Sequence, residues 1–356
     1  MNIYAIKNSS NILFRGYNGK TENVQISNTM GDCIHESHFM RNFESLYFSM
    51  DYLKKNFPNG TNIADFGCSG GEEAHSMAVL LHDSNKDKKY KITGYDIVPE
   101  VVEDARKGVF NIAEWTNLYE RFLVSDYSFQ YLTPEQKLAK ENFNKCFEKI
   151  PKDWEKFNIC DSRYKKKVKR YVKPGQDIEL ATRRLEYIYN PNSRMSNNGK
   201  YFIAKDGVFD NVIDFKVANI LNIDKELANQ KTGMVIFKNS LYHIFGSRGL
   251  DFYKNADINL AKELFTKINS VLPENGLFVL GILSGDHLIP KDVSLDYNTI
   301  FQNEEQIKVF NTSPVHKALK EAGFEPIFYE CGKTGGASFK KSSIYLPSVW
   351  KKIRSL

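Results

Sequence analysis

The feature of this sequence that most constrains the fold is the stretch DFGCSGGEEAHSMA, residues 65–78, where small residues separate an apolar segment from a helical pattern. TNIADF before the glycines predicts a buried strand, and the spacing of Ala74, Met77, Ala78 and Leu81 after them predicts a helix. YKITGYDI and PEVVEDARKGVF predict a second strand and a second helix. Strands alternating with helices indicate an α/β fold with a mostly parallel sheet flanked by helices.

Further elements are predicted on both sides of this core. Residues 1–30 contain short strand-like pieces, and residues 36–56 have the apolar spacing of an amphipathic helix. KYFIAKDGVFDNVIDFKV predicts a small β-hairpin whose turn is KDG. The C-terminal third predicts strands at GMVIF, LFVLGIL, EPIFYE and near SSIYLP, with helices at 257–272 and SPVHKALKEAGF.

These elements divide the chain into four predicted parts. They are N-terminal strands and a helix at 1–56, the first half of a ligand-binding α/β domain at 57–115, a largely helical basic insertion at 116–199, and the β-hairpin with the second half of the domain at 200–356. The insertion concentrates the positive charge, because residues 137–173 hold 13 Lys and Arg against 5 Asp and Glu, whereas the net charge of the whole chain is +6.

Composition favours a globular, cytoplasmic protein. The apolar fraction of 42% is too high for a disordered chain, and the longest apolar run, GLFVLGIL, is too short to span a bilayer, so no membrane association is expected. The first residues lack the pattern of a secretory signal. The five cysteines are an odd number without a CxxC pair, which predicts neither a disulfide framework nor a metal site.

The carboxyl ends of the predicted strands carry the residues expected to bind a ligand. Open α/β sheets bind ligands there, because glycine lets the backbone approach and a helix start offers free N–H groups. Asp65, Gly67 and Gly70 lie at the first such end, but their spacing is not GxGxxG, and Glu72 and Glu73 follow immediately. The pattern therefore differs from that of a dinucleotide-binding loop.

The two adjacent glutamates indicate the charge of the ligand. They would repel a pyrophosphate and attract a cation, although they also suit a helix N-terminus. S-adenosylmethionine carries an ammonium and a sulfonium and has no phosphate. Asp96, at the end of the second strand, is placed to accept hydrogen bonds from ribose hydroxyls. The alternative is that Glu72 and Glu73 only cap the helix and Asp96 only starts a turn.

Five segments in order resemble a known family. ESHFMR resembles T-x-F-F-R, CSGGEEAHSMA resembles S-T-G-E-E-P-Y-S-x-A, and YDIVPEVVEDARKGVF resembles a strand ending in D-I-D with an A-R-x-G-x-Y helix tail. FKVANIL is similar to F-x-x-x-N-L-L, and IFKNSLYHIF to F-C-R-N-V-x-I-Y-F. These motifs are those of the CheR-type chemotaxis-receptor glutamate methyltransferases. The resemblance covers about 35–112 and 200–283, and it implies a class I, Rossmann-like fold that binds S-adenosylmethionine.

The resemblance also implies roles for individual residues. Ser37 and Arg41 would face the donor and the transferred methyl group, whereas Asp65 is a feature of general class I methyltransferases rather than of this family. The other implied contacts are Glu73 with the methionine ammonium, Asp96 with the ribose, Asn219 and Ile220 with the adenine, and Asn239 and Ser240 with the floor near the sulfur.

The implied reaction is methyl transfer to a carboxylate, with protein glutamate as the candidate acceptor. Arg41 could orient that carboxylate through two hydrogen bonds, or it could form a salt bridge with Glu36 or Glu44 on one helix. Tyr242 and His243 follow the last motif, and Tyr242 stands in N-x-x-Y spacing after Asn239. His243 is either a general base for a hydroxyl or amine acceptor or a structural residue.

The sequence also allows partners other than a carboxylate-bearing protein. Tyr164 and Tyr171 are interleaved with a dense basic run at 163–173, which is typical of nucleic-acid binding but would equally steer an acidic protein partner. The alternative function is therefore a nucleic-acid or small-molecule N- or O-methyltransferase that uses Asn239, Tyr242 and the insertion. A third interpretation is a donor-binding sensor without catalysis.

Overall fold

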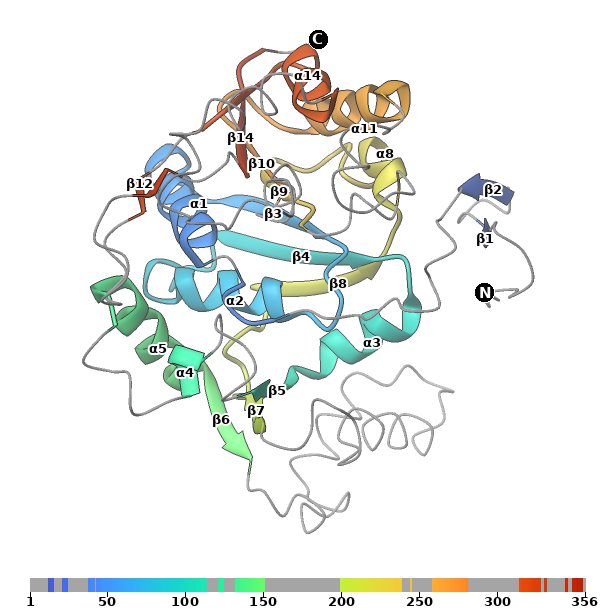
Figure 1. Ribbon diagram of the computed structural model, residues 1–356. Helices are drawn as coiled ribbons and strands as arrows, with labels where there is room; N and C mark the ends of the chain where they lie inside the picture. Colours follow the sequence, from blue (N-terminus) through green and yellow to red (C-terminus); the bar gives the residue numbers. More distant parts are fainter. Residues whose placement is uncertain are drawn as a thin grey trace, which may run out of the picture. The chain divides into compact units, whose positions relative to one another are not determined.

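The computed structural model describes residues 12–15, 21–24, 38–41, 43–113, 121–124, 132–150, 199–238, 244, 258–280, 314–327, 330–331, 343–344 and 348–354. The chain divides into two compact units (Figure 1). The unit that contains the glycine bend, here called the loop unit, comprises residues 36–219 and 332–340. The second, here called the C-terminal unit, comprises residues 1–35, 220–331 and 341–356.

The loop unit contains three neighbouring parallel strands. They are β3 (Thr61–Phe66), β4 (Tyr90–Asp96) and β8 (Ile213–Val217), with β4 in the middle. The register sets Phe66 opposite Tyr95 and Asp96 opposite Val217, so the carboxyl ends of all three strands meet at one edge. The predictions of β3 and β4 from TNIADF and YKITGYDI are confirmed.

Three helices of the loop unit follow the predicted periodicity. They are α1 (Phe43–Asn56), α2 (Glu72–Leu81) and α3 (Pro99–Lys107). α1 begins later than the predicted residue 36, because residues 38–41 form a turn in which Met40 has a φ of 53°, a value that a right-handed helix excludes. α3 has Pro99 in its first turn and ends at Gly108 in the left-handed region, as helix ends commonly do.

The predicted β-hairpin at 200–217 is wrong. β7 (Gly199–Ala204) instead lies between β5 (Val109–Ala113) and β6 (Phe147–Ile150) in an antiparallel three-stranded sheet, whereas β8 pairs with β4. The reason is the packing of one aromatic side chain from each strand. Phe202 of β7 contacts Phe143, and Phe215 of β8 lies over Gly94 of β4.

An aromatic cluster forms much of the core of the loop unit. The ring of Phe39 is edge-on to those of Phe110, Phe143 and Phe147, at centroid distances of 4.8, 5.5 and 5.5 Å. Phe143 and Phe147 lie at the end of α5 (Pro134–Cys146) and at its junction with β6. α5 begins with a Thr133–Gln136 capping box, and it confirms a predicted helical piece of the insertion, which also contains α4 (Arg121–Val124).

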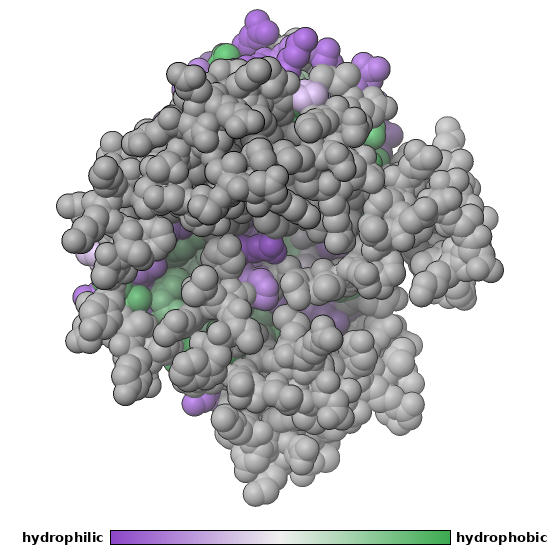
Figure 2. Space-filling model, in the orientation of Figure 1, coloured by the Kyte–Doolittle hydropathy of each residue, from purple (hydrophilic) through white to green (hydrophobic). Residues whose placement is uncertain are grey.

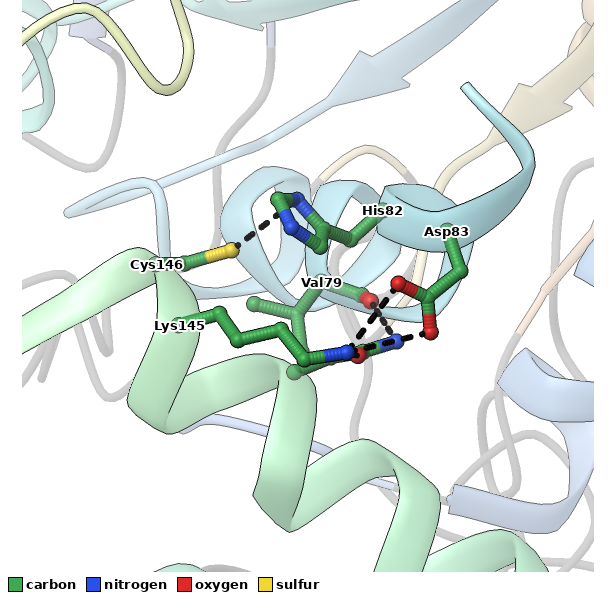
Figure 3. Close-up of polar contacts among 6 residues, drawn as sticks. Val79, His82, Asp83, Lys145 and Cys146 are labelled. Atoms are coloured by element: carbon green, nitrogen blue, oxygen red, sulfur yellow. Dashed lines mark hydrogen bonds and ion pairs between the residues drawn. The ribbon is translucent and has the colours of Figure 1, made fainter. Parts of the chain in front are cut away.

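Polar contacts join the end of α2 to α5 (Figure 3). Cys146 Sγ lies 3.4 Å from Nδ1 of His82, which begins the short 3-10 helix η2 (His82–Ser84), and Lys145 Nζ lies 3.1 Å from Asp83 Oδ1. Burial raises the pKa of the Cys146 thiol to about 12. Because the thiol stays protonated, it can donate only to a neutral imidazole.

This contact predicts a loss of stability in mild acid. Burial lowers the pKa of His82 below its ordinary value of 6.5, and the charges of Lys145 and Lys86 lower it further. The negative charge of Asp83 acts in the opposite direction but does not cancel the effect of burial. A lowered folded-state pKa means that the unfolded chain binds the proton more readily, so the stability that neutral His82 contributes is present above pH 6.5 and is lost as the pH falls through the folded-state pKa. Urea midpoints at pH 7.5 and pH 5.5 should therefore differ more for the native protein than for His82→Asn, and equal differences would contradict the prediction.

The C-terminal unit contains four neighbouring strands, one of which runs opposite to the other three. β9 (Thr232–Ile236) and β10 (Leu277–Val279) are parallel, and β14 (Val349–Lys352) is antiparallel to β10 and to β11 (Phe324–Pro326). The strand predicted near SSIYLP is confirmed, although it lies outside this sheet. There, β13 (Ser343–Ile344) pairs with β12 (Glu330–Cys331), and the apolar Val349 and Trp350 enter the core.

Two helices of the C-terminal unit match the predicted ones, and several short elements complete it. Its helices and remaining strands are α11 (Ile258–Val271), α14 (Pro314–Glu321), η5 (Ile220–Asn222), α8 (Ile223–Glu226), β1 (Ile12–Arg15) and β2 (Thr21–Val24). Buried Lys352 donates to the carbonyls of Asn269 and Leu272 and thereby satisfies the end of α11.

The strand order identifies the fold class. The main sheet has the order β11-β14-β10-β9-β3-β4-β8, and in chain order its strands from β8 to β10 read 3-2-1-4-5, the order of a doubly wound nucleotide-binding sheet. The predicted class I, Rossmann-like α/β fold is therefore confirmed. On the face drawn in Figure 2, hydrophilic side chains lie beside hydrophobic ones. Among the helices that the structure describes, none has the length and hydropathy of a membrane-spanning segment.

Candidate functional site

The glycine bend is held to the end of β4 by backbone hydrogen bonds. The N–H groups of Gly67 and Cys68 both donate to the carbonyl of Tyr95, at 2.7 and 3.1 Å. Gly67 has a φ of 70°, in the left-handed region that favours glycine. The chain thus turns away from β3 directly beside the end of β4, which brings residues 67–73 next to Asp96.

Asp96 is the residue around which this loop is organised. Its Oδ2 accepts the N–H of Ser69 at 3.1 Å, and its Oδ1 accepts the N–H of Val98 at 3.0 Å. The N–H of Ala218, just after β8, donates to the backbone carbonyl of Asp96 at 3.0 Å. Asp96 therefore starts the turn after β4 and holds the glycine bend beside the strand end.

Two glycines are required by close packing behind the loop. A Cβ on Gly94 would lie 2.5 Å from Cδ1 of Phe215, and one on Gly71, whose φ is 88°, would lie 2.8 Å from Cζ of the same ring. These distances are shorter than any real carbon contact, so larger side chains at either position would displace Phe215 from the core. The sequence alone could have pointed to Gly94, since an isolated glycine within a strand often marks a place where another group packs close to the backbone.

The first turn of α2 places the two glutamates beside the bend. A Cβ on Gly70 would lie 2.8 Å from Oε2 of Glu72, so that carboxylate folds back over Gly70, while the side chain of Glu73 is half-buried. The N-cap residue Gly71 provides no side-chain cap, and negative charge in the first turn is favourable for the helix dipole.

The electrostatic environment of the loop is negative. Burial raises the pKa of the Cys68 thiol well above its usual range, and the carboxylates of Asp65, Asp96 and Glu72 raise it further. The thiol is therefore protonated at neutral pH and is no nucleophile. Because three carboxylates act on one buried atom, with Asp65 itself fully buried, the loop attracts a cationic ligand rather than a phosphate.

Arg41 lies in the turn before α1 and not on the helix in which the sequence placed it. Its N–H donates to the carbonyl of His38 at 3.4 Å, and the preceding N–H, of Met40, donates to Oγ of Ser76 on α2 at 2.9 Å. The neighbouring Glu44 is within α1, and burial raises the pKa of its carboxyl. The sequence indicated Arg41 as a site residue, whereas Ser76 stood out only as the second serine of the matched motif in CSGGEEAHSMA and had no predicted role.

The other predicted site residues divide into two groups. Asn219 is half-buried after β8 in the loop unit, and Ile220 is buried in η5 of the C-terminal unit. Five positions lie outside the described residues, and their placement stays a prediction: Ser37, Asn239, Ser240, Tyr242 and His243. The basic run at 163–173, predicted to bind nucleic acid or to steer an acidic protein partner, also lies outside the described residues.

A cavity of about 360 Å³ lies in the loop unit behind the bend. Its lining includes His75, Arg106, Lys205, Phe209 and Phe215, and none of the predicted donor-binding residues among those the structure describes. Arg106 also forms an ion pair with Glu103 and donates to the Phe215 carbonyl. The imidazole Nδ1 of His75 is 2.8 Å from the Gly71 carbonyl, so His75 separates the cavity from the loop.

Residues 35–150 match the family described as CheR methyltransferase, SAM binding domain. Chemotaxis protein methyltransferases from two strains of Campylobacter jejuni are 32% identical to this chain over 136 residues, which is 36% of this chain and 51% of each relative. The chain therefore spans about half the length of the curated relatives it matches.

Solved structures of low sequence identity are also similar to this chain. One is a SAM-dependent methyltransferase from Methanosarcina mazei, with 12% identity, a TM-score of 0.29, and coverage of 83% of this chain and 93% of that chain. Another is human N-acetylserotonin methyltransferase, with 12% identity, a TM-score of 0.32, and coverage of 87% of this chain and 52% of that chain. Residues 35–150 are thus similar to the SAM binding domain of CheR methyltransferases, and the strand order and the acidic loop agree with this similarity.

Proposed function

We propose that this protein is an S-adenosylmethionine-dependent methyltransferase whose donor site is built on residues 65–73 and Asp96. The observation that carries the proposal is the acidic loop, in which backbone hydrogen bonds fix buried Asp96 at the strand end beside buried Asp65, and the charges of Asp65, Asp96 and Glu72 raise the pKa of the Cys68 thiol. A cation without phosphate suits this charge distribution. The match of residues 35–150 to a SAM-binding family supports the same donor.

In this proposal each donor-site residue has one task. Gly67 and Gly70 let the backbone approach the donor, Glu73 accepts hydrogen bonds from the methionine ammonium, and Asp96 accepts them from the ribose hydroxyls. Buried Asp65 keeps the potential of the loop negative. The remaining donor contacts are those predicted from the sequence: Asn219 and Ile220 for the adenine, and Ser37, Asn239 and Ser240 around the sulfur.

We further propose a carboxylate, in particular a protein glutamate, as the methyl acceptor. A carboxylate is already a nucleophile, so the enzyme needs no general base and must only align the carboxylate oxygen with the methyl group for in-line displacement. Arg41 supplies a planar guanidinium that can bind both carboxylate oxygens at once. The basic insertion at 116–199 would then recognise the acidic acceptor protein by its charge.

The chemical stability of the product tests the acceptor class. The protein is incubated with methyl-labelled S-adenosylmethionine and host lysate, and the labelled products are exposed to mild alkali. We expect volatile labelled methanol, because a methyl ester hydrolyses under these conditions. The matched control is Arg41→Gln, which keeps most of the side-chain stem and removes the guanidinium, and it should release much less methanol.

Other outcomes assign the protein differently. Alkali-stable label would identify a methylated amine, base or ordinary hydroxyl and would overturn the carboxylate proposal in favour of Asn239, Tyr242 and the basic insertion. Retained S-adenosylhomocysteine binding without labelling of any product would identify a donor-binding sensor instead of an enzyme.

A further inference from the structure

The turn that carries Arg41 is attached to α2 at one point of its backbone. The N–H of Met40 donates to Oγ of Ser76 at 2.9 Å, and both residues are fully buried. Met40 has a φ of 53°, which lies in the left-handed region of backbone conformations that residues other than glycine rarely adopt. A conformation of this kind persists only where surrounding contacts hold it, and the Ser76 hydroxyl is such a contact.

The hydroxyl of Ser76 uses its donor and an acceptor site at the same time. Its single hydrogen is donated to the carbonyl of Glu72 at 2.7 Å, one helical turn earlier, and a lone pair accepts the Met40 N–H. Ser76 therefore connects the backbone just before Arg41 to the backbone of Glu72, the first residue of α2. An alanine at this position would leave the buried Met40 N–H without its hydrogen bond.

A separate anchor keeps the other side of the turn in place. Phe39 is buried, and its ring packs edge-on against Phe110 at a centroid distance of 4.8 Å. Loss of the Ser76 contact would thus leave Phe39 in the aromatic cluster but free the backbone at Met40 to leave the left-handed region. The residue that moves with Met40 is Arg41.

From this geometry we infer that Ser76 is a positioning residue, which holds Arg41 at a fixed place relative to the acidic donor loop. The inference rests on the proposed function, because it assigns Ser76 an effect on methyl transfer through Arg41. Ser76 itself touches neither the donor nor the acceptor in this account.

A double-mutant cycle tests the inference. Ser76→Ala should lower kcat about fivefold in the otherwise native protein and leave the affinity for S-adenosylhomocysteine within twofold. In the Arg41→Gln background the same change should have almost no further effect, because the group that Ser76 positions is already absent. Ser76→Thr, which keeps the hydroxyl, should restore most of the activity.

A matched control separates positioning from general destabilisation. Ser49 is also fully buried, and its hydroxyl donates to the carbonyl of Ser45 at 2.7 Å within α1. Ser49→Ala should therefore leave kcat unchanged. Hydrogen exchange provides a readout apart from activity, since the Met40 amide should exchange at least tenfold faster in Ser76→Ala and at the native rate in Ser49→Ala.

The possible failures are distinguishable. If Ser76→Ala lowers kcat equally in the native and the Arg41→Gln backgrounds, or leaves the Met40 amide protected, the positioning role is overturned while the methyltransferase stands. If the native protein transfers no methyl group to any acceptor, the proposed function fails, and the role of Ser76 in methyl transfer fails with it.

Discussion

Replacing Asp96 with alanine is expected to weaken S-adenosylhomocysteine binding at least tenfold, which corresponds to ~1.4 kcal/mol. Two physical effects act in the same direction. The ribose hydroxyls lose a charged acceptor in a nearly buried position, since Asp96 is only 7% exposed. The loop also loses the two hydrogen bonds that Asp96 accepts from the N–H groups of Ser69 and Val98.

Two controls show whether the loss of affinity in Asp96→Ala comes from the lost contact with the ribose or from the changed charge and loop structure. Asp87→Ala removes the same charge from an exposed side chain before β4 and should leave the affinity unchanged. The second control is a ligand without the ribose hydroxyls. The native protein should bind this ligand more weakly than S-adenosylhomocysteine. Asp96→Ala should bind the two ligands equally well, because this variant lacks the partner of the hydroxyls. Calorimetry measures all five affinities, and an unchanged affinity of Asp96→Ala for S-adenosylhomocysteine would remove Asp96 from the donor site.

Replacing Glu73 with glutamine is expected to weaken S-adenosylhomocysteine binding at least tenfold, whereas the same change at Glu72 should cost less than threefold. Both residues lie in the first turn of α2, so each variant loses the same favourable interaction with the helix dipole. The difference between them isolates the contact with the methionine ammonium. S-adenosylhomocysteine has no sulfonium, so the long-range attraction between the loop and that second charge does not contribute.

The position of Glu72 explains why it serves as the control. Its carboxylate folds back over Gly70 and acts on the Cys68 thiol, inside the loop. Titration calorimetry at low and moderate salt should give the same ranking, because a direct hydrogen bond is less screened than a diffuse charge. A greater loss of affinity in Glu72→Gln than in Glu73→Gln would reverse the assignment and make Glu72 the ammonium ligand.

Local patterns in the sequence were sufficient to predict the elements that carry the donor loop. β3, α2, β4 and α3 each have a short-range cause: an apolar run, a helical spacing of small side chains, or a proline at the first turn. Because parallel strands end at one edge, the meeting of the glycine bend with Asp96 also followed from the order of these elements. The acidic character of the loop was also visible in the sequence, since Asp65, Glu72 and Glu73 lie within nine consecutive residues.

Contacts between distant segments decided the rest. The KDG turn between two strand-like segments predicted a hairpin, but Phe202 of β7 packs against Phe143 of α5 and Phe215 of β8 packs over Gly94 of β4. The spacing of residues 36–56 predicted one long helix, yet the hydrogen bond from Met40 to Ser76, 36 residues away, holds a turn at its start. Hydrophobic spacing records which side of a segment is buried, but the partner that buries it is chosen by tertiary packing, and so the place of Arg41 could be seen only in the structure.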